Sequence, residues 1–395
     1  MRFIKQVITV TAVGLYTIPQ RLSSSIVAVI GIAGVVVVLV AVLSIAEGFR
    51  AALTNAGRPD RAIVMRANAD SEMSSGLGAP DVDLIKQGTG VKRDGTLPVA
   101  SGEMFVVIDM NRKSTNTAAN VPLRGVESTV LGVRTEARIV EGRMFQFGTY
   151  EVVAGHAANG QYFGMNPGDT IRSGQVTWTV VGVFETNGTV AETEMWGDVR
   201  SLQAAYRRGN SYQSVLVQLD SADAFEAFKK DLLGNPALSV QVKRESDYYA
   251  EQSRTLTNMI QGIGYGVAFL MGIGAILGAV LTMYSAVVSR TREIATLRAL
   301  GFGALPVLVS VIGESLFLAL IGGAAGGALA YIGFNGYQAS TMNWQTFSQV
   351  AFGFAVTPAL LTQGLIYAMI MGLFGGIFPA IRAARLPISK ALREL

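Results

Sequence analysis

The sequence contains no cysteine and only one histidine, His156. The lack of cysteine excludes disulfides, thiolate metal sites and cysteine nucleophiles. Since His156 has no HExxH partner, the sequence does not favour a histidine-based metal site or catalytic triad, and we interpret His156 as a surface or structural residue. We therefore expect neither a catalytic residue nor a metal site.

Charged residues are also scarce. They make up 15% of the 395 residues, whereas hydrophobic residues make up 50%, and the mean hydropathy is +0.39. This composition is too apolar for an ordinary soluble protein of the same length, so it indicates an integral membrane protein. The net charge of +4 is too small to favour a nucleic-acid partner.

A nucleotide-binding loop is missing as well. No glycine-rich segment ends in Gly-Lys-Ser or Gly-Lys-Thr, which is the Walker A pattern that holds the phosphates of ATP. We therefore expect that this chain binds no cofactor and does not hydrolyse ATP itself.

Four apolar runs, in contrast, reach the roughly 20 residues that a helix needs to cross a membrane. They cover residues 25–46, 260–288, 305–334 and 359–381. The first run is rich in Val and Ile, yet its unbroken length favours a helix, because lipid admits only helices and closed barrels. The sequence predicts four transmembrane α-helices in a one-plus-three order.

Residues 47–259, between the first and second runs, have ordinary charge density and short alternating segments bounded by turn residues. Such segments predict β-strands, here at 62–65, 102–110, 150–153, 170–172, 177–184 and 214–219. Residues 199–206 and 223–233 have helical periodicity. The segment predicts a large mixed α/β domain outside the cytoplasm, with mobile loops at 71–80 and 112–120 and a helix from 247 that continues into the second span.

Lysine and arginine near the ends of the spans predict the orientation, because these residues concentrate on the cytoplasmic side. They occur before the first span, between the second and third, and after the fourth, but not in 337–357. We therefore expect both termini to be cytoplasmic. Residues 1–24 are interpreted as an amphipathic helix on the inner leaflet, 289–304 as a cytoplasmic helix, 335–358 as a short outer loop and 382–395 as a cytoplasmic tail.

Glu314 is the one ionisable residue well inside a predicted span. A carboxylate in the membrane is costly and functional by default, which keeps a proton or cation pathway open. A relay would need a chain of such groups, and a bond to an adjacent helix or to the arginines of the preceding loop is the simpler interpretation.

Small residues four positions apart recur in the last three spans, a spacing that lets helix backbones approach closely in lipid. We predict helix packing at Gly262, Gly266, Gly274, Gly278, Gly322, Gly323, Gly326, Gly327, Gly372 and Gly376.

The charged segment 289–301 lies between the second and third spans. At helical spacing Ile294, Leu297 and Leu300 form an apolar ridge, and Gly301 is placed to end the helix in a left-handed conformation. Periodicity alone leaves two interpretations: an ordinary loop helix with Arg290 and Glu293 paired, or a ridge that inserts into a groove on a cytoplasmic partner.

The segment Arg290-Thr291-Arg292-Glu293-Ile294-Ala295-Thr296-Leu297-Arg298-Ala299-Leu300-Gly301 resembles the R-x-x-E-I-G-x-x-R-A-x-G coupling segment of MacB/FtsX-type (type VII) ABC transporter permeases, with Ala295 in place of glycine. Glu314 matches a glutamate in the next span of that family. The ending Pro379-Ala380-Ile381-Arg382-Ala383-Ala384-Arg385-Leu386 and Ala391-Leu392-Arg393 is similar to the family's ending, although Pro387-Ile388-Ser389-Lys390 lacks its two acids.

The resemblance implies a permease of the bacterial inner membrane that rests on a cytoplasmic ABC ATPase dimer, which would hold ATP and magnesium. It assigns the coupling to Arg290, Arg292, Glu293, Ile294, Leu297, Arg298 and Gly301. A second copy or a similar permease, membrane lipids and a periplasmic adaptor are further candidate partners. It also implies an outer domain made of a membrane-linked part, 51–95 with 210–252, and an inserted part, 96–209.

Two functions remain open from the sequence. One is export of a substrate, or its extraction from the membrane or periplasm, driven by motion of the outer domain. The other is mechanical activation of an extracytoplasmic enzyme, such as a cell-wall hydrolase, without transport. The sequence does not name the substrate.

Overall fold

The computed structural model of the chain describes residues 2–16, 19, 22–343 and 346–387. The chain divides into two compact units: residues 1–47, 258–337 and 354–395 form one, and residues 48–257 and 338–353 form the other. Residues 388–395, which include the Ala391-Leu392-Arg393 part of the resemblance, lie outside the described residues.

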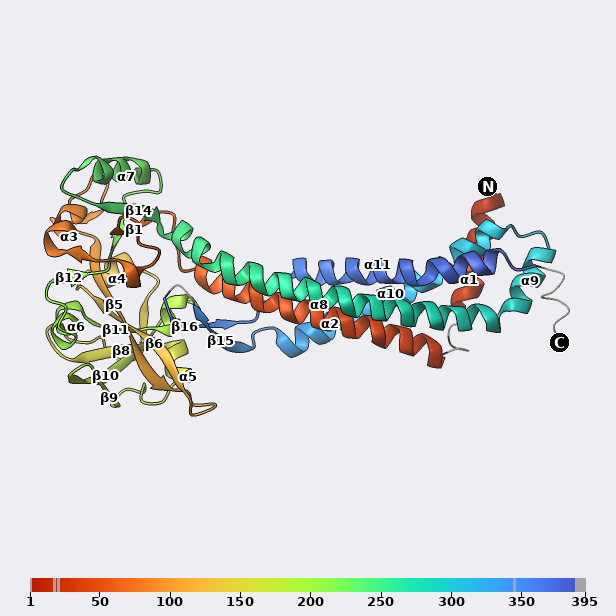
Figure 1. The fold of residues 1–395 in the computed structure, drawn as a ribbon, viewed down its shortest axis with the longest axis horizontal. Helices are drawn as coiled ribbons and strands as arrows, with labels where there is room; N and C mark the ends of the chain where they lie inside the picture. The colour runs from red at the N-terminus through yellow and green to blue at the C-terminus, as the bar shows by residue number, and fades with distance from the viewer. Residues whose placement is uncertain (1, 17–18, 20–21, 344–345, 388–395) are drawn as a thin grey trace. The chain divides into compact units, whose positions relative to one another are not determined.

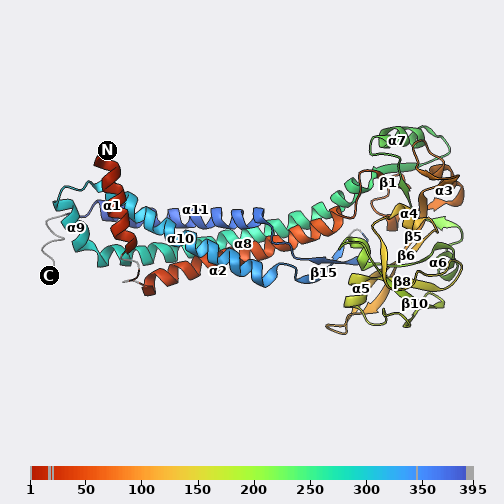
Figure 2. The same ribbon diagram turned by 180° about the vertical axis from the view of Figure 1, so that it is seen from behind.

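The first unit is helical, and its four long helices are long and apolar enough to cross a membrane. Its elements are α1 (Arg2–Tyr16), most of α2 (Leu22–Thr54), the membrane part of α8 (Glu245–Ser289), α9 (Thr291–Ala299), α10 (Ala304–Phe334) and α11 (Pro358–Ala384). Both views show the four long helices side by side (Figure 1, Figure 2). They contain the four predicted spans.

The long helices extend beyond the apolar runs. Residues 247–260 were expected to lead into the second span, and α8 confirms this because it runs unbroken from Glu245 to Ser289. α11 begins with Thr357, whose side chain accepts a hydrogen bond from the Leu360 amide, and with Pro358 in its first turn. Both residues favour a helix start, since proline needs no amide partner there.

The second unit is a mixed α/β domain built on one ten-stranded sheet. The strand order is β14-β1-β13-β5-β6-β11-β8-β10-β7, and β9 pairs with β10. The pairs β6–β11 and β8–β10 are parallel, and the other pairs of this sheet are antiparallel. The fold is therefore the predicted one: four apolar helices with a large mixed α/β domain between the first and second.

The strands of this sheet are β1 (Arg61–Arg66), β5 (Ala100–Asn111), β6 (Ala118–Val126), β7 (Arg138–Gly142), β8 (Glu151–Gly155), β9 (Thr170–Ser173), β10 (Val176–Glu185), β11 (Met195–Asp198), β13 (Ser214–Gln218) and β14 (Val240–Arg244). Short pairs are formed by β2 (Leu77–Gly78) with β12 (Ser211–Tyr212), β3 (Arg93–Asp94) with β4 (Leu97–Pro98), and β15 (Gln338–Asn343) with β16 (Ser348–Gly353).

Six short helices accompany the sheet: η2 (Glu72–Ser74), α3 (Ala79–Lys86), α4 (Val130–Val133), α5 (His156–Gln161), η3 (Val190–Thr193) and α6 (Val199–Ala205), while α7 (Ala224–Gly234) is longer. One hydrophobic core spans strands from β14 to β10, and a second surrounds Trp196 and Phe184. The strands from 51–95 and 210–252 pair with strands of 96–209 at β13–β5 and at β3–β4. The proposed division into two parts stays a prediction, because these strands pair directly.

Candidate functional site

The predicted coupling segment forms α9, a nine-residue helix. Its end is set by Gly301, whose φ is +96°, a value that strains any residue with a side chain. The Gly301 amide donates to the Arg298 carbonyl and the Phe302 amide to the Leu297 carbonyl, the two bonds of a Schellman motif. α9 therefore stops sharply before α10 begins at Ala304.

One side of α9 packs on its own helical bundle. Ile294 is only 6% exposed and lies in a cluster with Met283, Val307 and Ala383. The predicted ridge of Ile294, Leu297 and Leu300 is wrong in this respect, because Ile294 faces inward and cannot enter a partner's groove. Ile294 and Leu300 are six residues apart, which places their side chains about 120° apart around a helix, and the structure buries the first and exposes the second.

The other side of α9 faces outward. Leu300 is 73% exposed, and Arg292, Glu293 and Thr296 are exposed beside it, while Leu297 is half-buried. Arg298 is turned back toward the bundle, where its guanidinium donates to the Leu386 carbonyl at 2.7 Å. The surface open to a partner is the group Arg292, Glu293, Thr296 and Leu300, which we call the α9 outer face.

Arg290 connects α9 to Glu314 inside α10. Its guanidinium lies 3.0 Å from the Glu293 carboxylate and 3.3 Å from the Glu314 carboxylate. This confirms the expectation that Glu314 bonds to an arginine of the preceding loop. The positive charge of Arg290 compensates the buried charge of the Glu314 carboxylate.

Helix α1 completes this polar junction. The Ser310 hydroxyl of α10 donates to the Val10 carbonyl at 3.1 Å, and a Cβ added at Gly14 would lie 3.7 Å from the Glu314 carboxylate. Residues 2–16 are helical as expected, and their buried side around Val10 and Gly14 packs on α10. In both views α1 and α9 lie at the same end of the bundle (Figure 1, Figure 2).

The predicted packing glycines fall into two groups. A Cβ at Gly326 would lie 2.6 Å from the Ala33 carbonyl and one at Gly323 would lie 2.8 Å from Ala368, so these glycines bring helices into contact. Gly322, Gly327, Gly372 and Gly376 behave likewise. Within the described residues, however, a Cβ at Gly262, Gly266, Gly274 or Gly278 would meet no atom within 4 Å. Among the described residues, these four positions therefore face no neighbouring helix, whereas a Cβ at Gly264 or Gly272 of the same helix would meet Val42 or Tyr367.

The hairpin β15–β16, between α10 and α11, belongs to the outer domain and not to the helical unit. Arg112 at the end of β5 donates to Ser340 at 2.8 Å and to Gln349 at 2.7 Å. Asn343 donates to Gln252 at 3.1 Å in a buried contact. Sequence reasoning predicted only a short loop over 335–358 and did not find this attachment.

A buried ion network lies beneath the same hairpin. The Arg124 guanidinium bonds to the carboxylates of Glu72, Glu103 and Glu194 at 2.7 to 3.0 Å. Burial by itself would raise the pKa of the Glu72 carboxyl, but the charge and hydrogen bonds of Arg124, with a further bond from Ser214, lower it. The expectation of a mobile loop at 71–80 is therefore wrong, because Glu72 is fixed inside the domain.

His156 begins α5 on the surface, as expected. Among the residues that the structure describes, no group of three or more His, Cys, Asp or Glu residues could hold a metal ion.

The four apolar helices and the inserted α/β domain define a multi-pass membrane protein. Two family models match its sequence: the MacB-like periplasmic core domain over residues 25–234 and the FtsX-like permease C-terminal domain over residues 265–388. The first covers more than half of the chain, and both occur in the order that the resemblance implies. The chain belongs to the MacB/FtsX-type ABC transporter permeases, which places it in the bacterial inner membrane.

Individual relatives agree with this assignment. The chain is 26% identical to the macrolide export ATP-binding/permease protein MacB of Pasteurella multocida, over 80% of this chain and 48% of that protein. It is 26% identical to the uncharacterized ABC transporter permease YknZ of Bacillus subtilis, over 56% of each. The chain thus spans about half the length of the relatives that it matches.

Two solved structures are similar to part of the chain. The extracellular domain of YknZ is 20% identical, with a TM-score of 0.35. The match covers 46% of this chain and 99% of the YknZ structure. The periplasmic region of MacB from Actinobacillus actinomycetemcomitans is 14% identical, with a TM-score of 0.38. The match covers 51% of this chain and 96% of the MacB structure. The family assignment rests on the family models and not on these scores.

Proposed function

We propose that this permease couples ATP hydrolysis by a separate cytoplasmic ABC ATPase dimer to motion of its own outer domain. The observation that carries the proposal is the construction of α9, which is held on one side and open on the other. Ile294, Arg290 and Arg298 attach it to the bundle, while the α9 outer face presents Leu300 with charges of both signs. The α9 outer face is the side of this helix that stays accessible to a partner chain.

The ATPase would hold ATP and magnesium, and this chain would hold no cofactor. The lysine and arginine distribution supports a cytoplasmic position for α9 and both termini. The permease would act with a second copy of itself or a similar permease, in contact with membrane lipids. A periplasmic adaptor is a further partner of the proposed complex.

Three chain segments would transmit the motion. α2 and α8 each continue from the helical unit into residues of the outer domain. The β15–β16 hairpin is the third, because α10 precedes it, α11 follows it, and its side chains are bonded to Arg112 and Gln252. A push on α9 would reach α10 through the pair of Arg290 and Glu314, and the hairpin lies at the other end of α10.

We propose that motion of the outer domain drives export of a substrate, or its extraction from the membrane or periplasm. The printed name of the Pasteurella relative, a macrolide export protein, supports export. Mechanical activation of an extracytoplasmic enzyme is the alternative, and it uses the same coupling through α9.

Co-expression of the full chain with the ABC ATPase of its host tests the coupling. The complex is extracted in mild detergent, and bound ATPase and ATP hydrolysis are measured. Leu300→Asp buries a charge in the proposed contact, so we expect loss of binding of about tenfold or more. Arg172→Glu on β9 is the matched surface control, because Arg172 is exposed in the outer domain and should leave binding unchanged.

Two results would contradict the proposal. One is a wild-type chain that binds no ABC ATPase. The other is a Leu300→Asp variant that binds it and stimulates hydrolysis as the wild type does. ATP-driven uptake of substrate into inverted vesicles, compared with activation of a cell-wall hydrolase, separates export from the alternative.

A further inference from the structure

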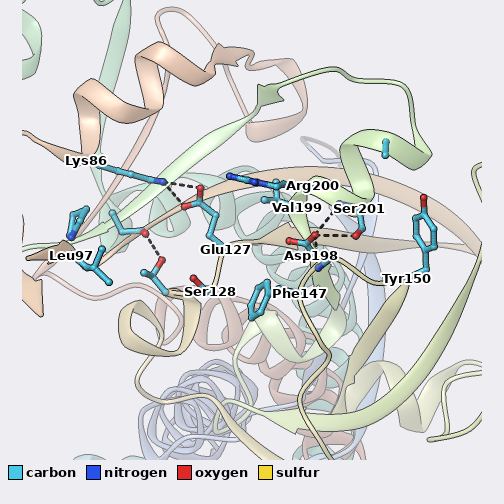
Figure 3. A pocket seen from close by; sticks show the side chains of 15 residues that line it. Lys86, Leu97, Glu127, Ser128, Phe147, Tyr150, Asp198, Val199, Arg200 and Ser201 are labelled. Atoms are coloured by element: carbon cyan, nitrogen blue, oxygen red, sulfur yellow. Dashed lines mark hydrogen bonds and ion pairs between the residues drawn. The ribbon is translucent and has the colours of Figure 1, made fainter.

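The outer domain contains a cleft of about 720 Å³, formed by the end of α3, the β4 strand and residue 100, residues 127–129, the loop before β8 and the start of α6. Figure 3 shows its side chains. Pockets for small molecules usually have volumes of about 300 to 1,000 Å³, so the cleft has the size of a ligand site.

One wall of the cleft is aromatic and rigid. Phe147 and Tyr150 are 42% and 41% exposed, although large apolar side chains usually avoid water. Each ring packs edge-to-face on a buried ring: Phe147 on Phe145 at 4.8 Å, and Tyr150 on Trp178 at 5.3 Å between centroids. The two exposed rings are therefore held in position before any ligand arrives.

The loop that carries these rings is also fixed by hydrogen bonds. The Gly148 amide donates to the Asp198 carboxylate at 3.1 Å, and the Gln146 amide donates to the Glu151 carboxylate at 3.0 Å. The Thr149 hydroxyl donates to the Gln146 carbonyl at 2.7 Å. A preorganised wall loses little entropy on binding, which favours affinity.

The charged groups of the cleft leave one cation available. The Glu127 carboxylate accepts from Lys86 at 2.6 Å and from the Gly102 amide at 2.8 Å. Asp198 is occupied by Gly148 and Ser201. Within the described part of the chain, the exposed Arg200 guanidinium makes no hydrogen bond or ion pair, and Figure 3 shows it beside the pair of Lys86 and Glu127.

A second cleft adjoins the first and does not change the balance of positive and negative side chains around Arg200. It shares Lys86, Glu127 and Arg200, and adds Asp83 and Arg207, one charge of each sign. A guanidinium with free N–H donors binds a carboxylate or phosphate through two parallel hydrogen bonds, that is, in a bidentate manner. An anionic group at Arg200 would leave the apolar part of the same molecule against the rings.

We propose that this cleft binds a small anionic amphiphile, with its carboxylate or phosphate on Arg200 and its ring or acyl part on Phe147 and Tyr150. The cleft would be the site where cargo first contacts the outer domain, and this role rests on the proposed function. Binding of the ligand itself requires no ATPase. Leu97 on β4 is exposed on the cleft lining and supplies further apolar surface for the ligand.

The test uses the full chain in lipid nanodiscs, without ATP or ATPase, and 2-naphthoate as the probe. Saturation-transfer difference NMR measures its affinity, with empty nanodiscs as background and 2-naphthylmethanol as the neutral analogue. We expect 2-naphthoate to bind at least about tenfold more tightly than the alcohol. Arg200→Glu should remove that preference, and Phe147→Ala should weaken both probes.

Arg172→Glu is again the control, since Arg172 is exposed but lines neither cleft, and its binding curve should match the wild type. The proposal is overturned if 2-naphthoate gives no signal above empty nanodiscs. It is equally overturned if Arg200→Glu, shown to be folded by its thermal unfolding, binds the probe unchanged. Loss of ATPase association in the coupling experiment would leave these results unaffected, so the two proposals fail separately.

Discussion

The guanidinium of Arg290 lies 3.3 Å from the carboxylate of Glu314, and both side chains are largely buried where α8, α9 and α10 meet. The same guanidinium also bonds to Glu293 of α9. One arginine therefore joins the candidate coupling helix to the third membrane helix. Among the described residues, this pair is an ionic contact between the start of α9 and a buried side chain of α10.

A double-mutant cycle measures this connection. Removing one member of a buried ion pair leaves the other charge unpaired, which costs about 3 to 5 kcal/mol, and we expect the lower end because Arg290 reaches the surface. Glu314→Gln and Arg290→Gln should each destabilise the chain in detergent, and the double variant should lose less than their sum. Additive losses, measured by chemical unfolding, would show that the two charges do not interact.

Gly301 should be intolerant of a side chain. Alanine at its φ of +96° costs about 1 to 2 kcal/mol, whereas asparagine tolerates the left-handed region better. We expect Gly301→Ala to loosen the end of α9, seen as faster hydrogen exchange of the amides of Gly301 and Phe302, and to weaken ATPase binding. Gly301→Asn should recover part of both losses, and equal behaviour of the two variants would argue against the proposed strain.

The sequence was sufficient for the membrane helices because each apolar run is a local signal, and the ends of α10 and α11 lie within a few residues of the prediction. It was insufficient wherever the deciding partner is distant in the chain. Glu72 has the surroundings of a loop residue in sequence, and only the fold brings Arg124 to it. Likewise, nothing near Ser340 or Gln349 indicates that Arg112 will bind them.

The candidate site shows the same limit. The helix, its glycine end and the arginine partner of Glu314 followed from short-range patterns. Short-range patterns did not show which side of α9 packs on the bundle. Ile294 and Leu300 are equally apolar, and only tertiary packing buries the first and exposes the second. The cleft at Arg200 combines residues from five separate segments, so no local motif could have predicted it.

The buried network predicts a pH dependence of the outer domain. Glu72 has a native pKa below its ordinary value of 4.5, so the native state holds its charge more strongly than the unfolded state. Its stabilising contribution is complete above pH 4.5 and is lost as the pH falls through the lowered native pKa. Thermal unfolding at a series of pH values should show this loss in the wild type and a flatter dependence in Glu72→Gln.

Glu72→Gln should also be less stable at neutral pH, because it removes one charged partner of Arg124. Glu141→Gln on β7 is the control, since Glu141 is exposed and its replacement should leave both the stability and its pH dependence unchanged. An identical acid transition in Glu72→Gln and the wild type would contradict the assignment to this carboxyl.

Arg112 should hold the β15–β16 hairpin on the outer domain. Arg112→Ala removes the hydrogen bonds to Ser340 and Gln349, and each such bond contributes about 1 kcal/mol. We expect faster hydrogen exchange in β15 and β16 and a lower ATP-driven activity of the complex. Lys113→Ala is the control, because Lys113 donates to the Asn159 carbonyl and not to the hairpin. Unchanged exchange in the hairpin after Arg112→Ala would refute this role.

The unpartnered glycines of α8 predict where a second copy packs. Small residues at Gly274 and Gly278 let two helices approach closely, and a disulfide needs Cβ atoms about 3.8 Å apart. Because the chain has no cysteine, Gly278→Cys introduces a single thiol, and mild oxidation of membranes should give a band at twice 41.8 kDa. Gly326→Cys is the matched control: its side chain would meet the Ala33 carbonyl inside the same chain, so it should destabilise the bundle without cross-linking. Cross-linking of Gly326→Cys but not of Gly278→Cys would contradict a dimer contact at α8.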